Sequence, residues 1–295
     1  MPEKYAAGNL AGPLCVGAIA IDTITGSIHD MVIRQLIRIV TSALCRIISN
    51  PPIMHIMNNK VVLIAGGTGG IGSATAKLFA KTGAKIVLAA RNREKADAIA
   101  AEINESGGEA YAVDLDVTDA SSVQKMAETV VGELGRIDVL VNAFGTGMIK
   151  GIAEAEPEKA KHVLDVNVYG TILVTQAVLR HMMAEKSGKV IMLPGILGKH
   201  VMRNTSIYSA SKFAVAGFTK ALVEETRRYG IGFTLLYLGG VATEFWENPD
   251  VEMKVQSDKM LVPEEVAKAV YYAVSQPAPG VLNEMVIQPD SHQMV

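Results

Sequence analysis

The sequence contains few of the residues that build disulfide frameworks or metal centres. Only two of its 295 residues are cysteines, Cys15 and Cys45, and both precede residue 57. The six histidines lie far apart and show no spacing typical of metal ligands. We therefore expect no metal site and no disulfide framework, and we expect a protein of the reducing cytoplasm.

Charge of one sign and aromatic side chains are also scarce. The net charge is −2, the two signs are mixed along the chain, and aromatic residues make up 5% of it. Nucleic-acid binding needs a clustered basic face, so we expect no nucleic-acid partner. The 27 glycines fit a fold with many tight turns between strands and helices.

Residues 1–56 differ in pattern from the main domain, which we place at 57–295. Within this N-terminal extension, residues 31–49 have arginines and polar residues on one side of a helical wheel and apolar residues on the other. Such an amphipathic helix fits peripheral contact with a membrane surface. The alternatives are packing on the main domain or on a second subunit, a presequence, or an addition before a natural start at Met57.

From residue 60 onward, short apolar runs alternate with helical patterns. The strands are predicted at 61–65, 85–90, 111–114, 137–141, 189–193, 233–238 and 285–287, and the helices at 73–82, 94–106, 120–134, 159–186, 208–229 and 263–275. Short apolar strands joined by helices indicate parallel pairing with right-handed crossovers. The expected fold is α/β, a doubly wound Rossmann-type sheet of seven parallel strands with helices on both faces, in a single domain.

The first predicted strand leads into a glycine-rich turn, residues 66–72 with the sequence GGTGGIG. Glycines allow the backbone to turn sharply and to approach a pyrophosphate without Cβ clashes. The amides and dipole at the start of the following helix then favour the phosphate charge. This pattern predicts dinucleotide binding at the carboxyl ends of the strands, although similar turns also occur without a ligand.

Tyr208 and Lys212 form the candidate for proton transfer. They are four residues apart in a predicted helix, so both side chains lie on one helix face. A nearby ammonium group favours the phenolate, so Lys212 is expected to lower the pKa of Tyr208. Such a tyrosine exchanges a proton with a carbonyl or hydroxyl group near neutral pH. Taken in isolation, the pair is equally an ordinary surface Tyr/Lys pair, because this spacing is very common.

Together, these motifs resemble the short-chain dehydrogenase/reductase family. The glycine turn, the strand at 138–142, Asn167 and the Tyr208/Lys212 pair occur in the order and spacing of that family, and the resemblance covers residues 58–295. Motifs in the last 35 residues are similar to a branch that contains NADP-dependent 3-hydroxy-acid dehydrogenases. The resemblance implies hydride transfer between a carbonyl and an alcohol, on a small-molecule substrate, in a homodimer or homotetramer associated through helices 159–186 and 208–229.

The resemblance also implies roles for individual residues. Tyr208 is the general acid in reduction and the base in oxidation, Lys212 binds the nicotinamide ribose, and Asn167 holds a water molecule that links Lys212 to solvent. Asp116 accepts from the adenine amino group, Asn142 lies near the adenosine ribose, and Thr243 contacts the carboxamide. The full set expected to bind the cofactor is Gly66, Thr68, Gly70, Ile71, Gly72, Arg91, Asn92, Asp116, Val117, Asn142, Gly145, Tyr208, Lys212, Gly240 and Thr243.

The end of the second strand predicts which dinucleotide is bound. An acidic residue there accepts from the ribose 2′-hydroxyl of NAD and repels a 2′-phosphate. This chain has Ala90 followed by Arg91, with Arg93 nearby, and a guanidinium can bind a phosphate bidentately. We therefore expect a preference for NADP(H) over NAD(H), and the alternative is that Arg91 is simply a solvated residue.

One family residue is missing. The serine that normally lies thirteen residues before the tyrosine, and donates to the substrate oxygen, is Gly195 here. One interpretation is an active reductase in which another group, such as Thr205 or Ser206, replaces that hydroxyl. The other is a catalytically weak NADP(H)-binding protein that acts as a redox sensor or scaffold.

The substrate is the least predictable feature. Residues 243–260 are expected to form a lid, and their Phe245 and Trp246 favour a substrate with an apolar body; the alternative is that both only pack the lid on the core. Arg203 is a candidate partner for a substrate carboxylate, and the alternative is a solvated residue.

Overall fold

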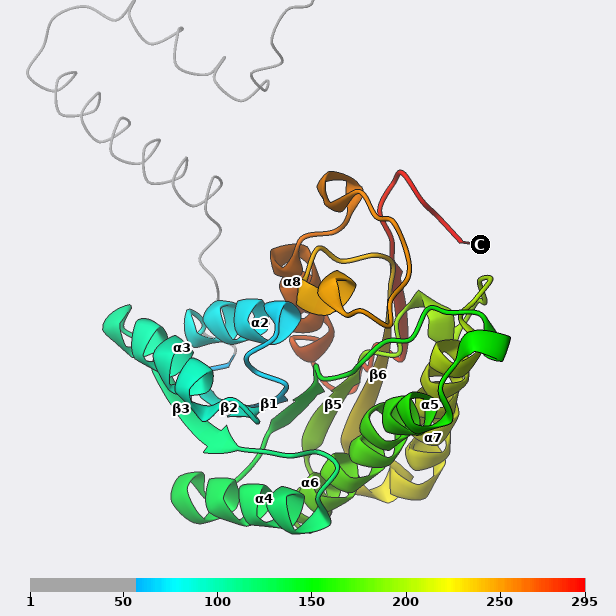
Figure 1. Cartoon of the computed structure of the whole chain (residues 1–295). Coiled ribbons are helices and arrows are strands. Elements are labelled where there is room, and N and C mark those ends of the chain that lie inside the picture. Colours follow the sequence, from blue (N-terminus) through cyan, green and yellow to red (C-terminus); the bar gives the residue numbers. More distant parts are fainter. Residues whose placement is uncertain (1–56, 295) are drawn as a thin grey trace, which may run out of the picture. The chain divides into compact units, whose positions relative to one another are not determined.

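The computed structural model describes residues 57–294, which form a seven-stranded parallel sheet with helices on both faces (Figure 1). The strand order is β3-β2-β1-β4-β5-β6-β7. The strands are β1 (Val61–Ala65), β2 (Lys85–Ala90), β3 (Glu109–Asp114), β4 (Val139–Asn142), β5 (Gly188–Met192), β6 (Ile231–Leu238) and β7 (Glu284–Ile287). The predicted doubly wound fold is confirmed. The predicted helix at 31–49, like the rest of 1–56, lies outside the described residues.

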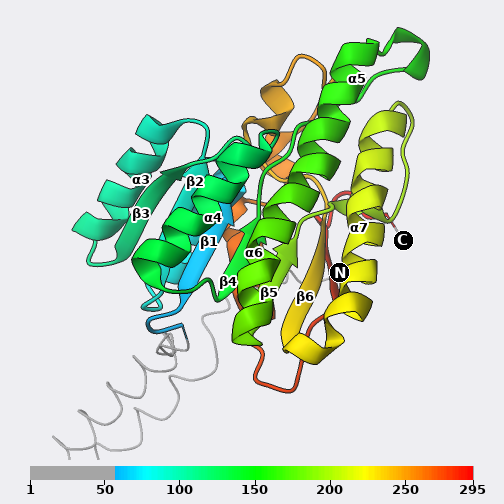
Figure 2. The same ribbon diagram turned by 90° about the horizontal axis from the view of Figure 1, so that it is seen from below.

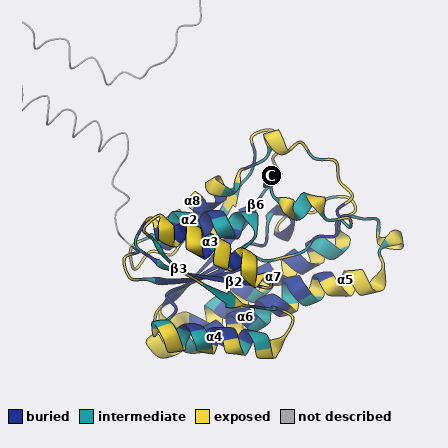
Figure 3. Ribbon diagram, turned by 60° about the vertical axis from the view of Figure 1, so that its left-hand side comes forward, coloured by how far each residue is buried: buried dark blue, intermediate teal, exposed yellow. Residues whose placement is uncertain are grey.

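Two layers of helices cover the sheet. The main helices are α2 (Gly70–Ala80), α3 (Arg93–Glu105), α4 (Ala120–Leu134), α5 (Pro157–Leu164), α6 (Thr171–Glu185), α7 (Ser206–Thr226) and α8 (Pro263–Val274). Helices α4, α6 and α7 pack on one face, in front of the sheet in Figure 2, and α2, α3 and α8 on the other. The dark blue residues of Figure 3 mark the two cores between these layers.

The position of strand β1 between two helical layers explains why its sequence is continuously apolar. Val61 and Leu63 point into the core beneath α4 and α6, whereas Val62 and Ile64 point into the core beneath α2 and α8. All five β1 residues are buried. A strand covered on both faces has no solvent side that would need polar residues.

The predicted helix at 159–186 is three elements in the structure. Helix α5 leads into a π-helical turn, η3 (Asp165–Gly170), and α6 follows. The whole stretch, Pro157–Glu185, is long and apolar enough to cross a membrane, but 56% of its most apolar window is buried inside the protein. We therefore interpret it as a core helical segment.

The order of the strands determines where a ligand can bind. The chain winds outward from β1 to β3 on one side and from β4 to β7 on the other. At this reversal between β1 and β4, the loops that follow the strands separate and leave a crevice at the carboxyl ends.

Candidate active site

The glycine turn between β1 and α2 forms a cradle that side chains would fill. Gly66 has φ +84°, and a Cβ atom there would lie 2.7 Å from the amide nitrogen of Phe144. A Cβ atom on Gly72 would collide with the carbonyl oxygen of Gly66, and one on Gly70 would lie 2.8 Å from Thr243 Cγ2. The first turn of α2 carries no acidic side chain. The cradle and the start of α2 therefore fit a pyrophosphate.

Three predicted adenosine-side residues lie around the ends of β2 and β3. Ala90 is buried and Arg91 is exposed. Asn92 caps α3, and its Oδ1 accepts from the amide of Lys95 at 2.9 Å. Asp116 accepts from the amide and hydroxyl of Thr118, and these hydrogen bonds lower the pKa of the Asp116 carboxyl. Thr68 lies in the glycine turn.

Arg93 has a different position from the one expected. Its Nε pairs with Asp97 at 3.0 Å and its guanidinium with Asp114 at 3.4 Å. These ion pairs direct the side chain along α3 and β3, so the Arg93 guanidinium is engaged with two carboxylates.

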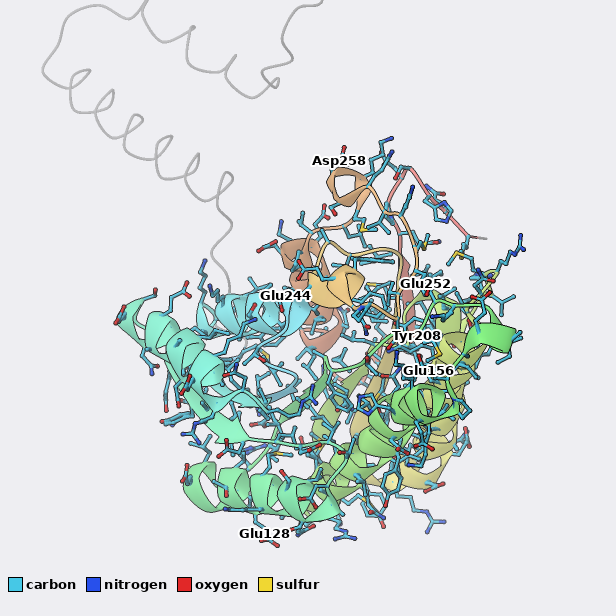
Figure 4. All side chains as sticks on the ribbon, in the orientation of Figure 1. Glu128, Glu156, Tyr208, Glu244, Glu252 and Asp258 are labelled. Atoms are coloured by element: carbon cyan, nitrogen blue, oxygen red, sulfur yellow. The ribbon has the colours of Figure 1, made fainter. Side chains whose placement is uncertain are left out.

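Tyr208 and Lys212 both lie on α7 and line one cavity of about 730 Å³. Lys212 Nζ lies 5.5 Å from the centre of the Tyr208 ring and donates to the carbonyl oxygen of Leu193 at 3.2 Å. Figure 4 shows Tyr208 beneath the segment that carries Glu244 and Glu252. The pairing predicted from the i, i+4 spacing is therefore present.

Burial dominates the acid–base properties of this pair. It lowers the pKa of Lys212 to about 8 and raises the pKa of Tyr208 above its ordinary value. The expectation that Lys212 lowers the pKa of Tyr208 is not met here, because loss of hydration is the larger effect on the phenol. Tyr208 is consequently a protonated phenol at neutral pH.

Asn167 lies in the π-helical turn and joins two parts of the site. Its Oδ1 accepts from the amide of Thr146 at 2.8 Å, and its Nδ2 donates to the Thr146 carbonyl at 2.8 Å and to Ser211 Oγ at 3.0 Å. The loop after β4 is thereby fixed to α7. A Cβ atom on Gly145 would lie 3.2 Å from Asn167 Oδ1 and 3.4 Å from Lys212 Nζ, so this loop passes directly against the pair.

The cavity opens at the carboxyl ends of β1, β4, β5 and β6. Of the predicted site residues, it brings together Gly70, Ile71, Gly145, Tyr208, Lys212, Gly240 and Thr243. The others lie outside its wall: Gly66, Thr68, Gly72, Arg91, Asn92, Asp116, Val117, Asn142 and Asn167. Within the described residues, no group of three or more His, Cys, Asp or Glu side chains is placed to hold a metal ion.

Four of the predicted site residues outside the cavity wall are buried, namely Gly72, Val117, Asn142 and Asn167. Asn142 donates to Thr175 Oγ1 and Met192 Sδ, and its Oδ1 has no hydrogen-bond partner among the described residues. Val117 packs against Gly170 of the π-helical turn. The structure therefore directs the side chain of Asn142 into the core between β4, β5 and α6.

Gly195 leaves one wall of the cavity without a side chain. Its φ is +66° and its ψ is 171°, and the nearest atom to a Cβ there would be the carbonyl oxygen of Leu238 at 3.8 Å. Space is thus available, but the backbone conformation is one that glycine adopts almost exclusively.

The two residues expected to replace the missing serine do not do so. The Thr205 hydroxyl is buried, donates to the carbonyl oxygen of Met202 at 2.6 Å and accepts from Ser209 Oγ, so it stabilises the start of α7. Ser206 is exposed and is not part of the cavity wall. Arg203 is also exposed and outside the wall, so it cannot pair with a carboxylate inside.

The sequence interpretation missed Thr146. Its hydroxyl accepts from Asn248 Nδ2 at 3.3 Å, and among the described residues no acceptor takes its proton. Of the other hydroxyls in the cavity wall besides Tyr208, Ser291 donates to Lys259 O and Thr243 Oγ1 accepts from the Phe245 amide. The position of Thr146, directly after the glycine that ends the β4 loop motif, was the available signal.

The predicted lid covers the cavity. Phe245 lies with its ring centre 5.6 Å from that of Tyr208 and 5.1 Å from that of Trp246. Val251 forms a parallel bridge with Ile149, and Lys159 pairs with Asp250 at 3.0 Å. The lid is therefore fixed to the loop that carries Thr146.

Comparison with known proteins agrees with this geometry. The family model described as short chain dehydrogenase matches residues 60–253. Uncharacterized oxidoreductases of Staphylococcus epidermidis and Staphylococcus saprophyticus are 33% and 32% identical to the chain; the alignments cover 79% and 82% of this chain and 98% and 100% of the relatives. The chain belongs to the short-chain dehydrogenase family and is an oxidoreductase of that family.

Two solved structures are similar in fold. One is an alcohol dehydrogenase from the archaeon Thermococcus sibiricus complexed with 5-hydroxy-NADP, with a TM-score of 0.73, 25% identity and coverage of 80% of this chain and 99% of that one. The other is a metagenomic short-chain oxidoreductase in complex with NADP, with a TM-score of 0.70, 27% identity and coverage of 79% and 99%. Both neighbours hold a nicotinamide dinucleotide of the phosphorylated type.

Proposed function

We propose that this protein is an NADP(H)-dependent oxidoreductase that interconverts a carbonyl and an alcohol, with Tyr208 as the general acid and base. The observation that carries the proposal is the common cavity of Tyr208, Lys212 and the start of α2. A proton donor, a buried cation and a phosphate cradle thus face one space at the carboxyl ends of the strands.

The residues of the cradle fit the cofactor. Gly66, Thr68, Gly70, Ile71 and Gly72 would hold the pyrophosphate. Arg91 forms no ion pair with another described residue and lies with Asn92 at the end of β2, where the 2′-phosphate of NADP would lie. Asp116 would accept from the adenine. Lys212 would bind the ribose next to the nicotinamide. When bound, the nicotinamide supplies or accepts the hydride.

Tyr208 can serve both directions of the reaction. As a phenol it donates its proton to the oxygen of a reduced carbonyl, and as a base it takes the proton of an alcohol. Burial raises the pKa of Tyr208, so the side chain rests in the phenol form at neutral pH. Asn167 acts as a positioning residue, because it holds Thr146 and α7 together.

We assign Thr146 as the second donor to the substrate oxygen, in place of the missing serine. Gly145, directly before it, approaches Lys212 Nζ, and Gly147, directly after it, lies against the Phe245 ring that packs on Tyr208. Thr146 is therefore held between two neighbours of Tyr208. Its hydroxyl accepts from Asn248, which leaves the proton for the substrate.

The variant Tyr208→Phe tests the proposal. We expect it to reduce the turnover of carbonyl substrates by at least about 10³-fold and to leave NADPH affinity within about twofold of the unmodified protein, because only the proton donor is removed. Turnover is measured by NADPH absorbance and affinity by NADPH fluorescence. The matched control is Tyr272→Phe, an exposed tyrosine on α8 that should change neither quantity.

The cofactor preference is tested in the same assay. We expect a larger kcat/KM with NADPH than with NADH, because Arg91 can pair with the 2′-phosphate. A larger value with NADH would reject the preference while leaving the reductase proposal intact.

The second candidate is a catalytically weak NADP(H)-binding protein, a sensor or scaffold. The observation that favours it is the glycine-only conformation at Gly195, where the family serine cannot be accommodated without strain. Under this alternative, NADPH binds but neither the unmodified protein nor Tyr208→Phe consumes it with any carbonyl.

A homodimer or homotetramer remains our proposal for the assembly. Leu164, Tyr169 and Phe213 are exposed apolar residues on α5, η3 and α7, the region expected at the interface. Light scattering on the full chain measures the assembly, and a monomer at micromolar concentration would reject it. A cytoplasmic location, with or without membrane contact through residues 31–49, is likewise a proposal, and cell fractionation tests it.

A further inference from the structure

We propose that the cavity selects carbonyl compounds with a large, uncharged, apolar body rather than short keto acids. This inference rests on the proposed function and adds the chemical class of its substrate. The residues that line the cavity away from the glycine turn carry it.

Methionines from separate segments meet in this wall. Met202 precedes α7, Met253 and Met260 lie in the lid, and Met294 comes from the C-terminal segment. Methionine side chains are apolar, unbranched and adaptable, so they form surfaces that fit varied aliphatic and aromatic shapes. Ile149 and Leu197 extend the same apolar lining.

The apolar surface begins directly at the proton donor. Phe245 packs on Tyr208, and Trp246 packs edge-on against Phe245. The Trp246 indole donates to the carbonyl oxygen of Val241 at 2.7 Å, so its polar atom is satisfied within the protein. Gly195 also lines the cavity and adds no side chain to it.

The C-terminal segment is held in place as part of this wall. Gln288 Nε2 donates to the Met294 carbonyl at 2.9 Å, and the Met294 amide donates to Gln288 Oε1 at 2.8 Å. Ser291 Oγ donates to the Lys259 carbonyl at 3.0 Å and ties the segment to the lid. Met294 is therefore fixed against the cavity by paired hydrogen bonds.

The three lysines that line the cavity are either exposed to solvent or already hydrogen-bonded, so the cavity offers no buried, unpaired cation to an anionic substrate. Lys212 is buried and bonded to Leu193, and Glu244 pairs with Lys95 at 3.1 Å. Lys254, Lys259 and His292 are exposed residues of the rim. Among the residues that line the cavity there is no arginine, the side chain suited to bidentate carboxylate binding.

The first experiment compares methyl ketones of increasing length, from 2-butanone through 2-hexanone and 2-octanone to 2-decanone, with pyruvate. With NADPH, we expect kcat/KM to rise about three- to fourfold for each added methylene until the cavity is filled, and pyruvate to be the poorest substrate. A flat series, or a preference for pyruvate, would overturn the inference while leaving the reductase function established.

The second experiment measures binding without turnover. Trp246 is the single tryptophan of the chain and lines the cavity, so its fluorescence in the presence of NADP⁺ reports ketone binding. We expect Met294→Ala to weaken 2-decanone binding about fivefold and to leave 2-butanone unchanged. Met183→Ala, on α6 outside the cavity, is the control and should change neither.

The two measurements separate the two claims. Length-dependent binding that Met294→Ala weakens, without turnover of any ketone, supports the apolar site and rejects the reductase function. Turnover that does not depend on chain length supports the reductase function and rejects the apolar site. Equal effects of Met294→Ala and Met183→Ala, or no fluorescence response to any ketone, would reject the apolar site.

Discussion

At Gly195 the chain adopts φ +66° and ψ 171°, so the replacement Gly195→Ser should introduce strain rather than restore a family hydroxyl. We expect it to lower the free energy of unfolding by about 1–3 kcal/mol and to give no gain in turnover. Urea denaturation and NADPH consumption measure the two effects. Gly132→Ser in α4, where a Cβ would meet no atom within 4 Å, is the control and should be neutral or slightly stabilising.

A stable and more active Gly195→Ser protein would contradict this view. It would mean that the segment after β5 can change conformation at little cost and can carry the serine as other family members do.

Thr146 offers the complementary test at the same scale. We expect Thr146→Val to reduce kcat by about 10²-fold, because one donor to the reacting oxygen is removed, and Thr146→Ser to retain most of the activity. NADPH affinity should be unchanged in both, as measured by fluorescence titration. If valine and serine have equal activity, Thr146 is not the second donor.

At the scale of elements, the effect of a substitution in the turn between β1 and α2 depends on which glycine is changed. We expect Gly72→Ala to weaken NADPH binding at least tenfold and to lower thermal stability, because its Cβ would press on the Gly66 carbonyl. Gly69→Ala is the matched control: Gly69 has φ −74°, and the nearest atom to its Cβ would be 3.6 Å away. Similar NADPH affinities for the two variants would contradict the proposed cradle.

The elements were largely predictable because buried parallel strands appear in the sequence as continuous apolar runs. β1 is apolar throughout and β2 is apolar after Lys85, and the predicted bounds of both agree with the structure. β3 begins at Glu109 rather than 111, because its alternating and partly exposed residues give a weaker pattern. The π-helical turn at Asp165–Gly170 was not predictable, since a change in hydrogen-bond register leaves the apolar spacing of the segment unchanged.

The site residues that share a helix face were predictable from their spacing. The site residues whose positions depend on loop conformation were not. Tyr208 and Lys212 share a face of α7, and the sequence alone states this spacing. Thr205 was a wrong candidate because its hydroxyl turns back to Met202, a contact set by the loop conformation. Thr146 was missed because its place in the cavity depends on Asn167, which is distant in sequence.

At the scale of the whole molecule, Lys212 links stability to pH. Its folded pKa of about 8 lies below the ordinary 10.5, so burial of its charge destabilises the fold fully below pH 8. Between pH 8 and 10.5 the unfolded chain binds more protons, and this destabilisation of about 3 kcal/mol is progressively lost. Relative to Lys212→Met, the unmodified protein should therefore gain stability as pH rises.

Denaturation midpoints of the two proteins at pH 7, 8, 9 and 10 measure this gain. The comparison cancels the titration of the other lysines, which both proteins share. A difference in unfolding free energy that does not vary with pH would show that Lys212 has an ordinary pKa in the folded protein.

The four methionines that line the cavity make the site sensitive to oxidising conditions. Oxidation converts methionine into a polar sulfoxide, and Met253 is exposed while Met294 is partly so, which makes their sulfur atoms candidates for attack. Sulfoxides in this wall would replace an apolar lining by a hydrated one next to Tyr208. The feature that we propose to select the substrate would then also make its turnover sensitive to peroxide, with recovery dependent on methionine sulfoxide reductases.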